Sequence, residues 1–383
     1  MDEKVYFVAL NMMTGIGPGK KRELLEYFKS AVNIFTVESS ELKSVIRGKA
    51  ESEVVDKRGV LLEQAEKELD KANLLNVGIT HIHANDYPGN LLSIPDPPIV
   101  LYYKGDLSNN NINSIAVVGC RNATPYGLNN SYRLGQGLAE KGVTVVSGLA
   151  KGIDGEAHKG CLDAGGNTIA VLGCGIDKIF PKEHTKLHYQ IAKEGCLLSE
   201  FPIGKEPRGF HFPMRNRIIC GLSVGVVVVE GSQDSGSLYT ANYALDYGRE
   251  LYAFPGPAQN YNYSGTHLLI KKGAKLIENT KDLLDDLSLV LDFELLSKTK
   301  EKKSYKNIPQ QNEILLDTNK KDFFLTDDEK IIFNCLSPVK SKYFDNIVED
   351  SGLRVEKVMS ILTSLVLKDL CIQTDGNHYL QSP

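Results

Sequence analysis

The stretch SIAVVGCRNATPYG, residues 114–127, decides the fold class of this chain. Its first five residues form a short apolar run, which suits a strand that is buried on both faces of a parallel sheet. Gly119 lets the backbone turn sharply after the strand, and the helix that follows offers its N-terminal amides to an anion. The stretch therefore predicts a strand–turn–helix unit with an anion site at the turn.

The same unit recurs along the middle of the chain. Between residues 113 and 285, helical patterns alternate with further apolar runs, which read TVVSG, NTIAVLGCG, CLLSEF, SVGVVVVEG and ELYAFPG. Short strands separated by helices are typical of a parallel sheet with helices on both faces. The sequence thus predicts an α/β fold whose centre is a Rossmann-like, doubly wound parallel sheet.

The flanking segments predict smaller modules. Residues 1–72 read as a helical domain of the helix–hairpin–helix type, whose Gly-rich turn before Lys20 would hold a phosphate or would simply join two packed helices. The central domain spans residues 73–290, because two short strands precede the parallel ones. The charged stretch 291–324 predicts a flexible linker. Residues 325–383 have the element order of a winged helix, with duplex binding, protein docking and a structural role all open.

Composition limits the class of protein. The 383 residues carry a net charge of −4, and no apolar run is long enough to span a membrane. The first residues contain acids and no cleavage site, so we expect no signal peptide. Seven scattered cysteines favour buried reduced thiols and a cytosolic protein. We see no zinc spacing and no GxGxxG motif, and we expect neither a metal nor a cofactor.

Ligands of an open parallel sheet bind beyond the carboxyl ends of its strands, so the loops that follow the strands are the candidate site. These loops combine small residues, glycines and cations, a composition that suits the successive phosphates of a polyanion. The candidates are Gly119, Arg121 and Asn122 after the first strand, Ser147, Gly148, Lys151 and Gly152 after the second, Lys182 after the third, and Ser235 and Gly236 after the fifth.

Residues 205–217, KEPRGFHFPMRNR, interleave cations with aromatic rings, as a single-stranded nucleic acid requires. Arg208, Phe210, Phe212, Arg215, Asn216 and Arg217 are the candidates in this stretch. An alternative is that the phenylalanines belong to the core and that the last two arginines pair with acids. Asn216 could also be the N-cap of a helix that begins with the apolar residues after it.

Several of these segments together resemble one known family. GCRNATPYG, SGLAKGIDGEAH, FPKEH, LLSEFPIG, FPMRNRIICGLS, SGSLYTANYALDYGRELYAFPG and SGTHLLIKKGA, in this order, are similar to the DNA-processing protein A family, DprA or Smf. The likeness is dense over residues 80–290, and the flanks resemble the family's SAM-like and winged-helix modules. Cys120 and Phe180 depart from the small residue and the tyrosine found in many members.

The resemblance implies a function. It implies a homodimer formed through the Rossmann domain, which binds and protects single-stranded DNA and loads the recombinase RecA in natural transformation or related recombination. It assigns phosphate clamping to Arg121 and a basic contact to Lys182. It places Ser147, Gly148, Lys151 and Gly152 on the second backbone loop, and Phe212, Arg215, Asn216 and Arg217 on the FPxRNR stretch.

An enzyme is the alternative, because nucleotide phosphoribohydrolases of the LOG type share this fold. Their motif requires a glutamate where this chain has Tyr243, so the carboxylate that the chemistry needs is missing at that position. Asp154 and Glu156 are the remaining candidates, although we favour capping or salt bridging as the role of both. We therefore expect a binding protein rather than an enzyme.

Overall fold

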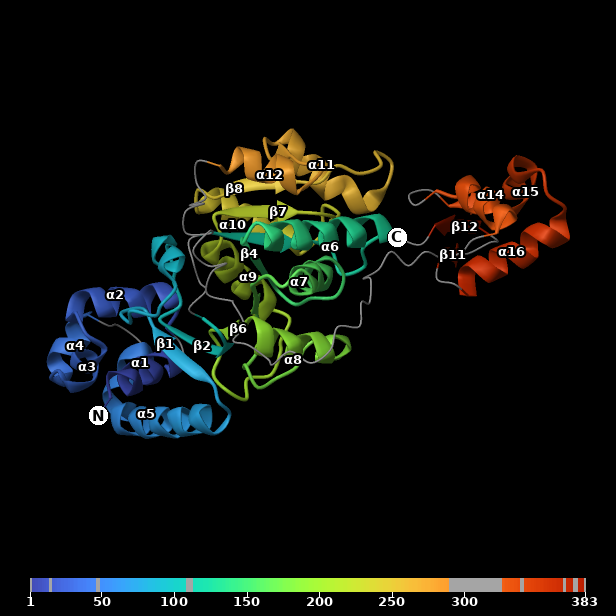
Figure 1. Cartoon of the computed structure of the whole chain (residues 1–383). Helices are drawn as coiled ribbons and strands as arrows, with labels where there is room; N and C mark the ends of the chain where they lie inside the picture. The colour runs from blue at the N-terminus through green and yellow to red at the C-terminus, as the bar shows by residue number, and fades with distance from the viewer. Residues whose placement is uncertain are drawn as a thin grey trace, which may run out of the picture. The chain divides into compact units, whose positions relative to one another are not determined.

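The computed structural model describes residues 2–13, 16–45, 49–107, 113–288, 326–337, 341–367, 370–374 and 378–381. The chain divides into two compact units, residues 1–304 and 305–383, which we describe separately (Figure 1). The expected linker at 291–324 lies outside the described residues.

A nine-stranded sheet of order β1-β2-β6-β5-β4-β3-β7-β8-β9 forms the centre of the larger unit. The six strands predicted for the central domain are present and parallel: β3 (Ser114–Val118), β4 (Thr144–Ser147), β5 (Thr168–Val171), β6 (Cys196–Ser199), β7 (Gly225–Val228) and β8 (Glu250–Ala253). β9 (Lys275–Leu276) extends one edge, and the antiparallel pair β1 (Gly78–His81) and β2 (Val100–Gly105) extends the other. The α/β prediction is confirmed, with a sheet that is mixed at one edge.

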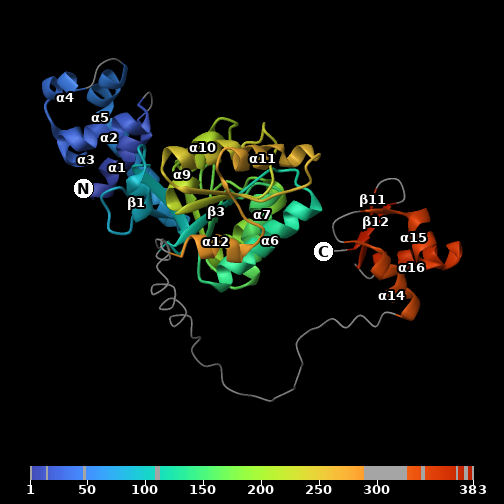
Figure 2. The ribbon, with the colours of Figure 1, turned by 90° about the horizontal axis from the view of Figure 1, so that it is seen from above.

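Helices cover both faces of this sheet because side chains along each strand alternate in direction. Ile115 and Val117 pack with α6 (Pro125–Glu140), α7 (Ile153–Asp163) and α12 (Thr280–Asp286). Ala116 and Val118 pack on the other face with α9 (His211–Leu222), α10 (Ser237–Asp246) and α11 (Ser264–Lys271). α8 (Thr185–Glu194) packs against β6 and β2. Figure 2 shows the two helical layers on either side of the sheet.

The direction of winding reverses next to β3. The chain proceeds outward from β3 through β4 and β5 to β6, and then returns to place β7 on the other side of β3. The loops after β3 and β7 therefore diverge around a crevice at the carboxyl ends of these strands, which is where open α/β sheets bind ligands.

The N-terminal helices share a hydrophobic core with the sheet. They are α1 (Glu3–Met12), α2 (Pro18–Phe28), α3 (Ala31–Thr36), α4 (Ser39–Val45) and α5 (Lys49–Leu74). Phe7 of α1 stacks on His81 of β1, with ring centroids 4.0 Å apart. The same core cluster includes Phe28 of α2 and Tyr102 of β2. This module is therefore packed against the sheet edge as part of the larger unit.

The basic residues beside the Gly-rich turn of this module are engaged within the protein. Lys21 is buried and donates to the Asn11 carbonyl oxygen at 2.7 Å. Lys20 pairs with Glu23, and Arg22 pairs with Glu26. These contacts favour the simple packed turn over a phosphate site.

The smaller unit contains α14 (Asp327–Cys335), β10 (Lys342–Tyr343), α15 (Phe344–Ser351), α16 (Val355–Leu367), β11 (Cys371–Thr374) and β12 (His378–Gln381). Its strands form an antiparallel sheet of order β10-β12-β11, and Ile332, Ile347 and Leu362 lie in its core. Lys357 of α16 pairs with Asp328 of α14 at 2.5 Å. Lys368 and the hairpin tip lie outside the described residues. Among the described helices of the whole chain, none has the length and apolarity to cross a bilayer.

Candidate nucleic-acid interface

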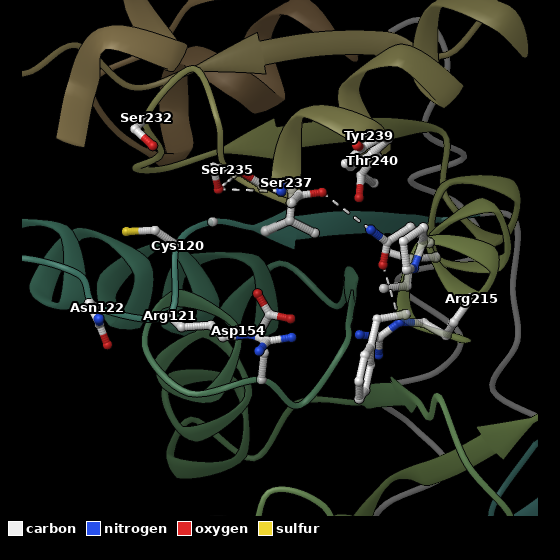
Figure 3. A pocket seen from close by; sticks show the side chains of 18 of the residues that line it. Cys120, Arg121, Asn122, Asp154, Arg215, Ser232, Ser235, Ser237, Tyr239 and Thr240 are labelled. Atoms are coloured by element: carbon white, nitrogen blue, oxygen red, sulfur yellow. Dashed lines mark hydrogen bonds between the residues drawn. The ribbon is translucent and has the colours of Figure 1, made fainter. Parts of the chain in front are cut away.

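A recess of about 600 Å³ occupies the crevice beside β3 and β7, and we call it the large recess (Figure 3). Its walls come from the β3–α6 loop, the first turns of α9, and the segment between β7 and α10. A second, small recess of about 80 Å³ adjoins it. The two recesses share Arg121, Ala150, Phe212 and Arg215.

The recesses bring together most of the residues predicted from the sequence. The predicted residues that line one or both of them are Gly119, Arg121, Asn122, Gly148, Lys151, Phe212, Arg215, Asn216, Ser235 and Gly236. Loops from four different strands thus meet at one end of the sheet, because the carboxyl ends of parallel strands lie together.

Aromatic rings form one side of this site. The Arg121 guanidinium carbon lies 5.4 Å from the centroid of the Phe212 ring, a cation–π distance. Phe180 is tilted against Phe212 with the centroids 5.3 Å apart. Phe180 and Phe210 are 37% and 60% exposed, so both offer ring surface to a ligand. Phe210 is therefore not the core residue that the alternative interpretation required.

Exposed cations border the same rings. Arg121, Lys182 and Arg208 are exposed, and none of them forms a salt bridge with another described residue. Lys182 belongs to η2 (Lys182–His184), which directly follows Pro181 in the wall of the small recess. Arg208 directly precedes Gly209, which lines the large recess. Lys151 is also exposed, but it pairs with Glu183.

Arg215 has a buried, supporting position between the two recesses. Its guanidinium donates to the Gly148 carbonyl oxygen at 2.7 Å and to the Val171 carbonyl oxygen. The Asp154 carboxylate accepts the Gly148 amide at 3.0 Å. Burial lowers the pKa of Arg215 to about 10, which leaves the group protonated at neutral pH. The side chain therefore holds the ends of β4 and β5 beneath the site.

Arg217 and Asn216 differ from the simple prediction. Arg217 is 2% exposed and pairs with Glu200 and, at 3.2 Å, with Asp96, so pairing with acids describes it better than DNA contact. The N-cap prediction for Asn216 is wrong, because α9 already begins at His211. The Asn216 side chain lines the large recess and donates to the Gly236 carbonyl oxygen at 3.4 Å.

Ser147 and Gly152 shape the second loop from within. The Ser147 hydroxyl is buried and donates to the Val117 carbonyl oxygen at 2.5 Å. Gly152 has φ +77°, and a Cβ atom there would clash with the Cys120 carbonyl oxygen. Both residues keep the loop close to β3, and neither lines a recess.

Glu230 is a structural centre that the sequence analysis missed. Its buried carboxylate accepts the Thr124 amide at 2.9 Å, the Thr124 hydroxyl at 2.7 Å, the Tyr263 hydroxyl at 2.8 Å and the Asn262 amide at 3.0 Å. It thereby joins the loop that carries Arg121 to η3 (Tyr261–Tyr263). These partners lie more than 30 residues away in the sequence, so no local pattern marks them.

Comparison with known proteins gives this geometry a context. The family model of DNA recombination-mediator protein A matches residues 78–288, more than half of the chain. This chain belongs to that family. As a family member, it has a role in DNA processing and recombination.

Individual relatives agree with the family assignment. Protein Smf of Synechocystis is 36% identical over 294 residues, which are 75% of this chain and 73% of that protein. DNA processing protein DprA of Bacillus subtilis is 45% identical over 207 residues, 54% of this chain and 70% of that protein. The X-ray structure of DprA from Streptococcus pneumoniae matches with a TM-score of 0.68 and 34% identity, covering 74% of this chain and 98% of that one.

A further structure concerns DNA processing protein A from Helicobacter pylori and its single-stranded DNA binding mode. It matches with a TM-score of 0.51 and 29% identity, and covers 56% of this chain and 97% of that one.

The carboxylates considered for catalysis have structural partners in this family member. Glu156 pairs with Lys159 at 2.6 Å, and Asp154 accepts the Gly148 amide. Tyr243 packs on Tyr247, the C-cap residue of α10, with the ring centroids 5.5 Å apart. The contacts of Glu156 and Asp154 agree with the structural interpretation of these two carboxylates. Cys120 lies beside Glu230, and burial raises the pKa of its thiol to about 12, so the thiol is protonated at neutral pH.

Proposed function

We propose that this chain binds single-stranded DNA across the two recesses. One observation carries the proposal. Arg121 and the exposed Phe180 ring line the recesses, Lys182 directly follows Pro181 of the small recess, and Arg208 and the exposed Phe210 flank Gly209 of the large recess. None of these three cations forms a salt bridge with another described residue. The H. pylori relative, which is described with single-stranded DNA, supports the same ligand.

The chemistry of the site favours a single strand over a duplex. Cations follow the phosphate backbone, and an exposed ring stacks on a nucleobase with about 1–3 kcal/mol per base. Stacking on a side chain requires an unstacked base, which a duplex offers only after it opens. Because any base has a face that can stack, we expect little preference for sequence.

A titration of labelled oligo-dT against the matching dT·dA duplex tests this proposal. We expect the single strand to bind about tenfold more tightly or better, a difference of about 1.4 kcal/mol. Equal affinity for the two forms would contradict it.

We further propose the recombination-mediator role in its full form, in which the bound strand is protected and passed to RecA. Family membership supports this role. The initial rate of RecA filament formation on an oligonucleotide coated with single-strand-binding protein should rise when the chain is added. An unchanged rate would argue against loading.

We also propose that the chain forms a homodimer through its central domain. β9 is an edge strand, and Leu276 on it is 50% exposed. Open edges and exposed apolar side chains are surfaces on which a second sheet can pair. Sedimentation should show a dimer that Leu276→Asp converts to a monomer, whereas a monomeric wild type would contradict the proposal.

A further inference from the structure

The large recess has a neutral wall that the cations of the site do not explain. Ser232 and Ser235 line it from the segment between β7 and α10, Ser237 and Thr240 line it from the first turn of α10, and Asn262 lines it from η3. Each of these side chains is an uncharged hydroxyl or amide that can donate a hydrogen bond. Figure 3 shows the serine and threonine side chains along one side of the cavity.

Thr240 is the decisive residue of this wall. It is 1% exposed, and its hydroxyl makes no hydrogen bond to any described residue. This hydroxyl is therefore available to donate to a group that enters the recess. Its oxygen points into the large recess (Figure 3), where an acceptor from a ligand would satisfy it.

The backbone of the wall favours an anion as that ligand. Thr240 lies in the first turn of α10, a helix of 10 residues whose N-cap, Gly236, supplies no side-chain cap. The amides of the first turn already have acceptors, because Ser237 bonds to the Ser235 hydroxyl oxygen at 3.4 Å and Leu238 bonds to the Ser235 carbonyl oxygen at 3.0 Å. The dipole of the helix start still attracts negative charge. Gly236 is exposed and has open space around it, so a ligand can approach the backbone closely. The Ser235 and Ser237 hydroxyls lie 2.8 Å apart and bond to each other, so the pair keeps one hydroxyl proton to donate to a ligand.

We propose that this neutral wall binds the phosphate group of one nucleotide, with the Thr240 hydroxyl as a direct donor. The inference rests on the proposed single-strand binding and adds a position where a phosphate is held without a cation. Serine and threonine hydroxyls and helix starts are common phosphate ligands in protein–DNA complexes. Asp154 is the acidic residue in the wall of the large recess, and its carboxylate accepts a hydrogen bond from the Gly148 amide.

Neutral recognition has a measurable consequence. A cation that neutralises a phosphate displaces condensed counterions, whereas a hydroxyl donor displaces none. Removal of the Thr240 hydroxyl should therefore weaken binding equally at all salt concentrations. A loss of a cation contact, in contrast, changes the slope of affinity with salt.

The test compares Thr240→Val, which keeps the shape and removes the hydroxyl, with Thr240→Ser, which keeps the hydroxyl. The probes are labelled oligo-dT with and without a 5′-phosphate, and thymidine 5′-monophosphate titrated directly. We expect Thr240→Val to bind about tenfold more weakly, as for one hydrogen bond to a charged group. Thr240→Ser should bind like the wild type, and the salt slope should be unchanged in both variants.

The probes also distinguish the source of the phosphate. A loss with both oligonucleotides supports an internal phosphate, a loss confined to the phosphorylated one supports a strand end, and a loss with the mononucleotide alone supports a free nucleotide. Wild-type affinity of Thr240→Val for all three probes would overturn the inference. If Thr240→Val does not fold, Ser237→Ala replaces it with the same expectations.

Failure of the inference and failure of the proposed function give different results. If wild-type protein binds oligo-dT with strong salt dependence and Thr240→Val matches it, only the neutral phosphate site is wrong. If wild-type protein binds no oligonucleotide, the proposed function fails, and the mononucleotide titration still decides the role of Thr240.

Discussion

Arg121 presents an exposed guanidinium where the two recesses meet, and no carboxylate in the described part of the chain pairs with it. Arg217 has the same chemistry but lies buried against Glu200 and Asp96. Both arginines could be named as candidates from the sequence, because each stands in a segment that follows a predicted strand. Burial and pairing depend on residues that are distant in the chain, so the sequence could not separate the two.

Charge reversal at single residues tests the cations of the site. Arg121→Glu, and separately Lys182→Glu, should weaken oligo-dT binding by about tenfold or more, or about 1.4 kcal/mol, because each change replaces attraction to a phosphate by repulsion. Fluorescence anisotropy measures the affinity, and circular dichroism verifies folding.

Lys67→Glu is the matched control for these variants. Lys67 lies on α5, outside both recesses, and carries the same charge. Its reversal should leave affinity close to the wild type. Equal losses in the control and in Arg121→Glu would mean that total charge, rather than a local site, controls binding.

At the scale of elements, the predicted parallel strands were recognisable because each is a short apolar run bounded by turn residues. β9 has only two residues and gives no such signal. The start of α9 was missed because Pro213 and the aromatic residues around it resemble a loop. Proline is nevertheless compatible with the first turn of a helix, and Pro213 is the third residue of α9.

The loop that carries Arg121 depends on Glu230 for its position. Glu230→Gln keeps the shape of the side chain but replaces an acceptor by a donor among four donating groups. We expect the free energy of unfolding to fall by about 1–3 kcal/mol, and oligo-dT affinity to fall with it. Urea unfolding followed by circular dichroism measures the first effect.

Glu250→Gln provides the comparison, since Glu250 is a half-exposed acid that pairs with Lys275 at 2.9 Å. An exposed pair contributes about 0–1 kcal/mol, so this variant should remain near the wild type in stability and affinity. If Glu230→Gln were equally mild, Glu230 would not position the loop.

At the scale of the whole molecule, the net charge of −4 is a poor guide to the ligand. Local arrangement matters more than the sum, because acids such as Glu23, Glu26 and Asp328 neutralise basic residues outside the recesses. The sequence could indicate which loops meet at the sheet edge. The sequence could not show that the basic side chains beside the Gly-rich turn already have partners within the N-terminal module.

The division into two units leads to a prediction for a truncated chain. Residues 1–304 contain both recesses, so this fragment should keep oligo-dT affinity within about threefold of the full chain, a difference of about 0.7 kcal/mol. Titration of the two proteins side by side measures it. A large loss would assign single-strand binding to residues 305–383 instead.

The dependence of oligo-dT affinity on salt tests the central claim most directly. If cations at the recesses neutralise about four to six phosphates, log affinity should fall against log salt with a slope of roughly −3 to −4, and Arg121→Ala should make the slope shallower by about 0.7. A wild-type affinity that does not change with salt would contradict the account.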